Sequence, residues 1–421
     1  MIRTIAHFDL DAFFCAVEEI LNPDLRGKPF VVGASPGERG VVASASYPAR
    51  RFGIRSAMPT AQALRLCPDL ILVRGRHGLY GEYSDKVMEL VREAAPVAEQ
   101  ISIDEAFLDL SAHPDPGREV AAGLQAEIRR RFDLPTSWGV ASNKLVAKIA
   151  TNVGKPAGLV VVPPGEEAAF LAGLPVGMLW GVGPVAQAEL ERADVRTIGA
   201  LASLPTEELR SLFGERGIDL AARARGEDDS PVEEGHEAKS MSSETTFSHD
   251  LSDRDELHRT LRSLSEDVGQ RLREAGLAGM TVRIKVRWPD FTTITRQRRL
   301  PQPTDLDGEI FAVAAGLLGE AWKRGRPLRL LGVAVANLGP PVRQLGLFDR
   351  RWEEDARLLK AVDRIRSKYG WEALQRAADI EPGARSGPKR RAGSASEEEG
   401  GEGKGGQGGL GKRDPGGLPG G

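Results

Sequence analysis

Apolar and polar residues follow two different periods along the first 163 positions of the chain. Short apolar runs predict strands at residues 4–11, 30–32, 41–45, 70–73, 97–101, 106–110, 136–140 and 159–162. Longer stretches with apolar residues three or four positions apart predict helices at residues 12–21, 80–94, 118–132 and 144–153. Residues 47–66 predict a helix that is interrupted at Gly53 and Pro59. Strands interleaved with helices that pack on one side of them indicate an α+β sheet.

The pattern changes after Pro163. Residues 164–232 are mostly helical in pattern, and residues 233–240 are polar and acidic, as expected of a linker. Strands at 239–246, 281–287, 292–300 and 328–338 alternate with helices at 254–275 and 305–322, which is the split β-α-β-β-α-β order. Residues 350–381 predict an amphipathic helical extension, and the glycine-rich residues 382–421 predict disorder.

Length and composition indicate a multidomain globular protein. The 421 residues are too many for one typical core, so two to four domains are expected. Hydrophobic residues make up 41% and charged residues 28%, which is ordinary for such a protein. The two cysteines, Cys15 and Cys67, provide no disulfide framework and no zinc spacing, so we expect reduced thiols in a cytoplasmic protein. No long apolar span predicts membrane insertion.

Acidic residues end two of the predicted strands. Asp104 and Glu105 lie in an apolar run, and a tight turn near Ser102 would let both reach one place. Asp9 ends the first strand, and carboxylates about 4 Å apart repel by roughly 4 kcal/mol at an effective dielectric of 20. Two Mg²⁺ ions would relieve this repulsion and form an all-oxygen site for phosphoryl transfer. The alternative is that these are ordinary solvated acids at strand ends.

Longer motifs surround these acids, in a fixed order. They are His7-Phe8-Asp9-Leu10-Asp11-Ala12-Phe13-Phe14-Cys15-Ala16-Val17-Glu18-Glu19, Tyr47-Pro48-Ala49-Arg50-Arg51-Phe52-Gly53-Ile54-Arg55-Ser56-Ala57-Met58-Pro59-Thr60, Ser102-Ile103-Asp104-Glu105-Ala106, Ser142-Asn143-Lys144, Ala147-Lys148-Ile149-Ala150 and Lys155-Pro156. Together they resemble the motifs of the Y-family DNA polymerases, in the bacterial DNA polymerase IV branch. The resemblance covers about residues 1–350.

The resemblance implies a right-hand polymerase fold of the multidomain α+β class. It places a catalytic palm at residues 1–11 and 76–163, small fingers at 12–75, and a helical thumb with a helix-hairpin-helix at 164–232. A linker at 233–240 would lead to a β-α-β-β-α-β little finger at 241–341. A clamp-binding peptide at 342–349 would precede the helical extension and the tail.

The resemblance also assigns roles to single residues. Asp9, Asp104 and Glu105 would be catalytic metal ligands for two Mg²⁺ ions, with the Leu10 carbonyl a further oxygen. Residues implied to bind the nucleotide are Phe14, Ser44, Tyr47, Arg50 and Lys155. Phe14 would be the steric gate against ribonucleotides, with plain core packing as the alternative. Asp11 is not placed in the catalytic trio. Arg55 and Lys148 are further candidates for triphosphate contacts, with support of a helix as the alternative.

DNA binding is expected from two regions, although the formal net charge is −3. Gly181 and Gly183 form a Gly-x-Gly turn, either an ordinary helix end or a hairpin whose amides bind DNA phosphates. Arg283, Lys285 and Arg287 share one strand face, and Arg296 and Arg298 lie together on the next strand. We expect one continuous basic strip along the DNA backbone, with a solvated face as the alternative.

The remaining expectations concern partners and fidelity. Gln344-Leu345-Gly346-Leu347-Phe348 resembles the peptide that binds the bacterial sliding clamp. Small residues in the fingers, at positions 43–46 and 49, predict an open site, low fidelity and lesion bypass. The implied partners are primer–template DNA, dNTPs and the sliding clamp, and a monomer is expected. The alternatives are a catalytically inactive clamp-binding adaptor of the same family and a nucleotidyl cyclase.

Overall fold

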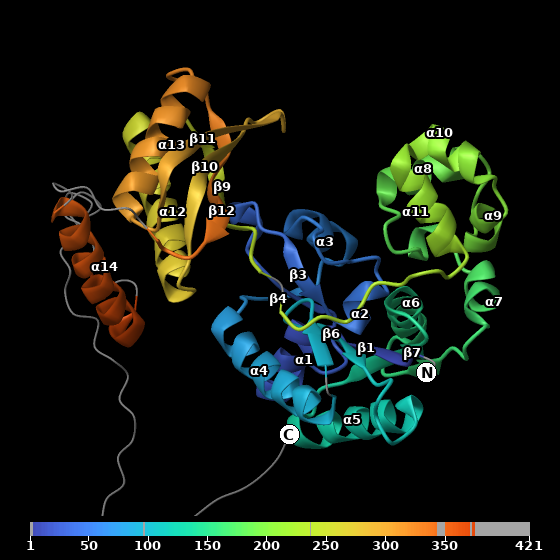
Figure 1. Cartoon of the computed structure of the whole chain (residues 1–421). Helices are drawn as coiled ribbons and strands as arrows, with labels where there is room; N and C mark the ends of the chain where they lie inside the picture. Colours follow the sequence, from blue (N-terminus) through green and yellow to red (C-terminus); the bar gives the residue numbers. More distant parts are fainter. Residues whose placement is uncertain (1–2, 96, 236, 343–349, 371–372, 375–421) are drawn as a thin grey trace, which may run out of the picture. The chain divides into compact units, whose positions relative to one another are not determined.

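The structure is a computed structural model that describes residues 3–95, 97–235, 237–342, 350–370 and 373–374. The chain divides into two units, Met1–Ala361 and Val362–Gly421. Figure 1 labels its helices and strands. In the described part of the chain, every helix is too short or too polar to cross a membrane.

The first unit contains a five-stranded sheet in the order β5-β6-β1-β7-β8. Its strands are β1 (Ile5–Leu10), β5 (Val97–Gln100), β6 (Glu105–Asp109), β7 (Thr136–Ala141) and β8 (Leu159–Val161). The helices of this region are α4 (His77–Ala94), α5 (Gly117–Phe132) and α6 (Lys144–Gly154). All these elements lie where the hydrophobic pattern predicts them, within a few residues.

Helices cover both faces of this sheet, which corrects the expectation of helices on one side. Ala6, Phe8 and Leu10 of β1 join the core that includes α4 and α5. Ile5 of β1 and Phe107 of β6 join a second core, with α6. Successive strand residues point to opposite faces, so His7 and Asp9 share the α6 face with Ile5.

A three-stranded sheet in the order β3-β2-β4 forms a smaller core of its own. The strands and helices of this segment are α1 (Phe13–Leu21), η1 (Pro23–Leu25), β2 (Phe30–Gly33), η2 (Pro36–Glu38), β3 (Val42–Ala45), α2 (Tyr47–Arg50), α3 (Thr60–Leu66) and β4 (Ile71–Val73). The interruption in the predicted helix is wider than expected, because residues 51–59 are not helical. Gly53 and Ala57 in this stretch have φ angles of +79° and +66°, which a helix does not accommodate.

A helical region follows β8. It contains α7 (Glu167–Ala172), η3 (Val176–Met178), α8 (Pro184–Arg192), α9 (Ile198–Ala202), α10 (Thr206–Phe213) and α11 (Glu215–Ala224). Its apolar residues belong to the same core as α6. The segment after α11 is also tied to α6: Lys144 Nζ donates to the Pro231 carbonyl at 3.1 Å, and Asn143 Nδ2 donates to the Gly226 carbonyl at 2.8 Å.

The predicted β-α-β-β-α-β order is confirmed further along the chain. It consists of β9 (Ser240–Leu251), α12 (Arg254–Glu274), β10 (Ala278–Arg287), β11 (Thr293–Thr304), α13 (Asp307–Ala321) and β12 (Leu328–Gly339). The strands form one sheet in the order β11-β10-β12-β9. Val282, Ile284 and Val286 share a buried core with both helices, so α12 and α13 cover the same face of the sheet. The opposite face is called the open face below.

One more helix, α14 (Arg350–Tyr369), falls within the predicted extension. Most of the predicted clamp-binding peptide, residues 343–349, and the whole tail at 382–421 lie outside the described residues.

Candidate active site

Antiparallel pairing of β1 with β6 brings the separated acids together. Asp9 lies directly opposite Glu105 in the register of the two strands. Just beyond this pair, the Leu10 amide donates to the Asp104 carbonyl at 2.9 Å. Asp104 lies in the turn between β5 and β6, where the Ser102 hydroxyl donates to its carboxylate at 2.5 Å. The turn predicted near Ser102 is therefore confirmed, and it holds Asp104 at the end of β1.

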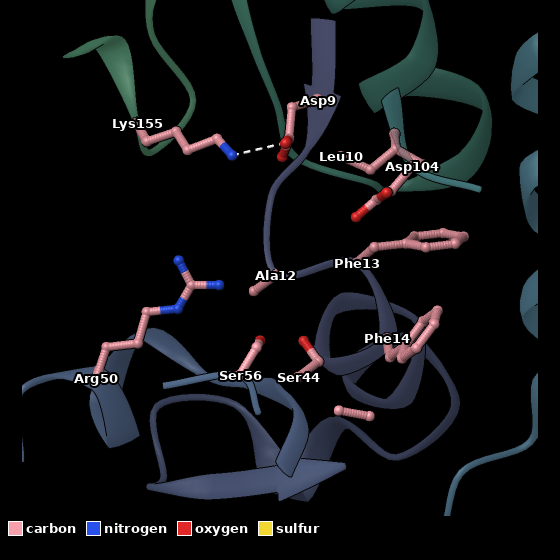
Figure 2. A pocket seen from close by; sticks show the side chains of 11 residues that line it. Asp9, Leu10, Ala12, Phe13, Phe14, Ser44, Arg50, Ser56, Asp104 and Lys155 are labelled. Atoms are coloured by element: carbon pink, nitrogen blue, oxygen red, sulfur yellow. Dashed lines mark ion pairs between the residues drawn. The ribbon is translucent and has the colours of Figure 1, made fainter. Parts of the chain in front are cut away.

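A pocket of about 130 Å³ opens beside these acids (Figure 2). Its lining residues are Asp9, Leu10, Ala12, Phe13, Phe14, Ala43, Ser44, Arg50, Ser56, Asp104 and Lys155. Most of the residues expected to bind metal or nucleotide are thus brought to one place from four separate segments. Glu105 and Tyr47 are the two that do not line it.

Lysines neutralise two of the carboxylates. Lys155 Nζ lies 2.7 Å from Asp9 Oδ2, and Lys148 Nζ lies 2.5 Å from Glu105 Oε2. His7 is almost fully buried and places Nε2 3.4 Å from the same Glu105 oxygen. Glu105 in this structure therefore points to Lys148 and His7, which the sequence analysis did not pair with it.

The three groups titrate differently because their surroundings differ. Burial raises the pKa of Asp9 to about 6, with Lys155 opposing the rise and the charges of Asp104 and Glu105 adding to it. Burial acts in the same direction on Glu105, but hydrogen bonds from His7 and Lys148 outweigh it and lower the pKa to about 2. Burial lowers the pKa of His7 to about 4, so its ring is neutral at pH 7.

The oxygen donors suit Mg²⁺ only in part. Among the described residues, no three carboxylate, imidazole or thiol groups lie close enough to hold a metal ion by themselves. Mg²⁺ is commonly bound by one or two carboxylates, with substrate phosphates and water completing its shell. Asp9 and Asp104, which face one pocket, match that pattern, so the residues present fit the ion when a phosphate substrate supplies the remaining oxygens.

The two phenylalanines at the start of α1 have different surroundings. Both residues line the pocket, but Phe13 is buried in the core, whereas Phe14 is only partly buried against that core. The Phe14 ring stacks on Tyr80 with centroids 4.3 Å apart and planes 14° apart. His77 contacts the Phe14 ring edge-on at 5.7 Å. Phe14 is thus held in place from behind and has one side toward the pocket.

Comparison with known proteins agrees with this geometry. Residues 8–152 match the impB/mucB/samB family, and residues 238–347 match the C-terminal domain of that family. A protein named DNA polymerase IV from Dehalococcoides mccartyi is 42% identical over 382 residues, which are 89% of this chain and 97% of the relative. Another DNA polymerase IV, from Alkalilimnicola ehrlichii, is 43% identical over 353 residues, 82% of this chain and 99% of the relative.

A solved structure supports the same assignment. The Y-family DNA polymerase chimera Dbh-Dpo4(243-245)-Dbh matches with a TM-score of 0.73 and 28% identity, over 80% of this chain and 99% of the chimera. This chain belongs to the Y-family DNA polymerases, in the DNA polymerase IV branch. Its separate C-terminal sheet, β9 to β12, is the little finger of that family.

The little finger corrects the prediction of one continuous basic strip. Arg283 lies opposite Gln297, and Lys285 lies opposite Thr295, so these cations are on the open face of the sheet. Arg296 and Arg298 lie opposite Ile284 and Val282, whose side chains are in the core. Directly opposed residues share a face, so Arg296 and Arg298 are on the helix side, where Arg298 pairs with Glu320 of α13 at 2.5 Å.

The Gly-x-Gly turn lies just before α8 in this polymerase. Gly181 has φ +106°, a region that favours glycine, and Gly183 is the N-cap of α8. Both line a pocket of about 320 Å³ with Phe213 and Arg216. The expectation of a glycine turn between helical segments is therefore confirmed.

Sequence reasoning missed the structural role of Asp11. This buried carboxylate accepts hydrogen bonds from the Tyr47 hydroxyl at 3.0 Å, the Ser137 hydroxyl at 2.7 Å and the Ala157 amide at 2.8 Å. The Arg50 guanidinium lies 4.6 Å from the centre of the Tyr47 ring. Asp11 thus joins the fingers segment to β7 and to the Lys155 loop, and only its place in Asp9-Leu10-Asp11 could have drawn attention to it.

We expect Asp11→Ala to destabilise the protein more than Tyr47→Phe does. The alanine leaves three donors without their acceptor and should cost roughly 3 kcal/mol, whereas the phenylalanine removes one hydrogen bond, worth roughly 1 kcal/mol. Thermal unfolding followed by circular dichroism should rank the midpoints wild type, Tyr47→Phe, Asp11→Ala. Equal midpoints for the two variants would show that Asp11 does not connect three segments.

Proposed function

We propose that this polymerase adds dNTPs to a primer 3′-hydroxyl by two-metal phosphoryl transfer, directed by a template. The observation that carries the proposal is the pocket in which Asp9 and Asp104 face Arg50 and Lys155. Two anionic groups would hold metal and two cationic groups would hold phosphate, in a space lined by residues from distant segments. The proposed cellular role is low-fidelity translesion synthesis in damage tolerance.

The carboxylates of Asp9, Asp104 and Glu105, with the Leu10 carbonyl, would hold two Mg²⁺ ions. Bound Mg²⁺ would lower the pKa of the primer hydroxyl and stabilise the charge on the triphosphate and the leaving pyrophosphate. Glu105 lies beside Asp9 across the strand pair, so a change of its side-chain rotamer would bring it toward the site.

Arg50, Lys155 and Ser44 would bind the triphosphate. A guanidinium can donate to two phosphate oxygens at once, whereas Lys155 acts as a point charge. In the structure Lys155 pairs with Asp9, so an incoming triphosphate would compete for this lysine and leave Asp9 available for metal. Tyr47, held by Asp11, would support Arg50 through its ring.

The decisive experiment compares Asp104→Ala with Asp69→Ala, a matched control at an exposed acid. Asp104→Ala should lower the rate of single-nucleotide incorporation about 10³-fold or more, because it removes a ligand that stabilises transition-state charge. Asp69→Ala should stay within about twofold of wild type. Primer extension with Mg²⁺ measures both, and normal incorporation by a folded Asp104→Ala protein would reject the mechanism.

Phe14 would act as the steric gate below the sugar of the incoming nucleotide. The ring is backed by Tyr80, so it cannot move away easily, and overpacking by a 2′-hydroxyl costs about 1–3 kcal/mol. Removal of the ring opens this space without touching the carboxylates.

We expect Phe14→Ala to raise ribonucleotide incorporation relative to deoxyribonucleotide incorporation by about tenfold or more. Steady-state kcat/KM for each nucleotide on the same primed template gives the ratio. Phe30→Leu, a change at a buried phenylalanine of the same core that does not line the pocket, is the control and should leave the ratio near that of wild type. An unchanged ratio in Phe14→Ala would remove the gate assignment.

DNA would be bound by the turn at Gly181 and Gly183 and by Arg283, Lys285 and Arg287 on the open face of the little finger. Backbone amides of the turn would donate to phosphate oxygens without reading sequence. Lys285 pairs with Glu244 at 2.8 Å and would exchange this partner for phosphate. Arg296 and Arg298, on the other face, would contact DNA only from the edge of the sheet.

Low fidelity would follow from the small side chains beside the site. Ala43 and Ser44 line the pocket. Their small side chains would leave the space over the nascent base pair open. Geometry of the pair would then be checked loosely, so distorted template bases could be copied.

The peptide Gln344–Phe348 would bind the sliding clamp and raise the local concentration of polymerase at the primer end. We expect deletion of residues 344–348 to abolish clamp stimulation and to leave extension without clamp unchanged. Extension of a primed circular template with and without clamp measures this. Equal loss under both conditions would contradict the assignment.

The domain boundaries given by the sequence are proposed for the polymerase: palm 1–11 and 76–163, fingers 12–75, thumb 164–232 and linker 233–240. We also propose that it acts as a monomer in the cytoplasm. An inactive adaptor would have no need of the acids that line the pocket. A nucleotidyl cyclase would have no need of the little finger. Both alternatives are therefore less consistent with the chain than a polymerase.

A further inference from the structure

A cluster of cations surrounds an exposed aromatic ring at one end of the little-finger sheet. Phe291, in the turn between β10 and β11, is 62% exposed and has φ +65°, a backbone region that favours glycine. Arg329 at the start of β12 places its guanidinium 4.4 Å from the centre of the Phe291 ring. A large apolar ring is therefore presented to solvent with a cation on one of its sides.

The surrounding residues add positive charge. We call this group the tip cluster, and its members are Phe291, Lys323, Arg324, Arg326 and Arg329. Arg287 pairs in register with Leu330, so the start of β12 lies beside the β10–β11 turn. Arg326 lies 4.2 Å from the Trp288 ring, which brings the turn between α13 and β12 to the same end.

The turn that carries Phe291 is well braced. The Trp288 amide donates to the Thr292 carbonyl at 2.9 Å, and the Phe291 amide donates to the Trp288 carbonyl at 3.0 Å. Asp290, the acid of this turn, accepts from the Thr292 amide at 2.9 Å. The position of the ring is thus set before any ligand binds, which reduces the entropy lost on binding.

We propose that the tip cluster binds the unpaired template strand, with a base stacked on Phe291 and phosphates near the arginines. Exposed aromatic rings among cations are typical of single-strand binding, because every base has a face that can stack. Bases within a duplex are already stacked on their neighbours, so this ring fits unpaired nucleotides better. The tip cluster is distinct from Arg283, Lys285 and Arg287, which share the open face of the sheet. The proposal rests on the proposed polymerase function, which supplies a template with an unpaired 5′ segment.

The test measures how much a longer template overhang strengthens binding. Fluorescence anisotropy with the full chain would compare primed DNA of one duplex length carrying a 1-nucleotide or an 8-nucleotide 5′ overhang. Wild type should bind the longer overhang about tenfold more tightly at fixed salt. Phe291→Ala should lose most of this gain and Phe291→Trp should keep it. Tyr369→Ala, at an equally exposed aromatic residue of α14, should behave as wild type.

An abasic overhang separates stacking from charge and uses the unaltered protein. Wild type should lose most of the gain when the eight overhang nucleotides lack bases, because the phosphates remain but nothing can stack. Arg324→Gln should reduce the gain on both normal and abasic overhangs. Two results would overturn the proposal. One is a gain in affinity from the longer overhang that is the same in Phe291→Ala as in wild type. The other is a full gain in affinity on the abasic overhang.

Failure of the polymerase function itself gives a different result. The tip cluster has no strand to bind on the 1-nucleotide overhang. If wild type incorporates no nucleotide there, the proposed polymerase function is rejected. Normal incorporation there, combined with an overhang gain that does not depend on Phe291, would reject the tip cluster alone.

Discussion

The antiparallel pairing of β1 with β6 is the constraint on which the candidate site depends. It sets Asp9 against Glu105 and ties the Leu10 amide to the Asp104 carbonyl, although the two strands are about a hundred positions apart in the chain. A register shift of one residue would turn Asp9 to the opposite face of the sheet. Apolar side chains on both faces oppose such a shift, because they belong to two separate cores.

Electrostatics explains why carboxylates can be gathered there before substrate arrives. Lys155 and Lys148 stand as counter-ions for Asp9 and Glu105, so the repulsion between the acids is offset within the protein. Under the proposed mechanism, a triphosphate bound to Lys155 would take this lysine from Asp9 and leave the carboxylate available for metal.

The sequence predicted the helices and strands well because their hydrophobic periods are regular. It could not predict what depends on partners from distant segments. The donors that Asp11 collects come from Tyr47, Ser137 and Ala157, and no local pattern links them. The face of Arg296 and Arg298 depends on which residues of β10 lie opposite them, whereas alternation along β11 shows only that the two share a face.

The core that α6 shares with the helices after β8 has a mechanical consequence. Side chains from both regions interlock, and Asn143 and Lys144 fasten the chain beyond α11 to the same helix. Val182, next to Gly181, and Phe107, two residues after Glu105, belong to this one core, and the Phe107 ring lies 6.2 Å from that of Trp180. If the turn holds a DNA phosphate, as proposed, the distance from that phosphate to Glu105 would be set by the packing of this single core.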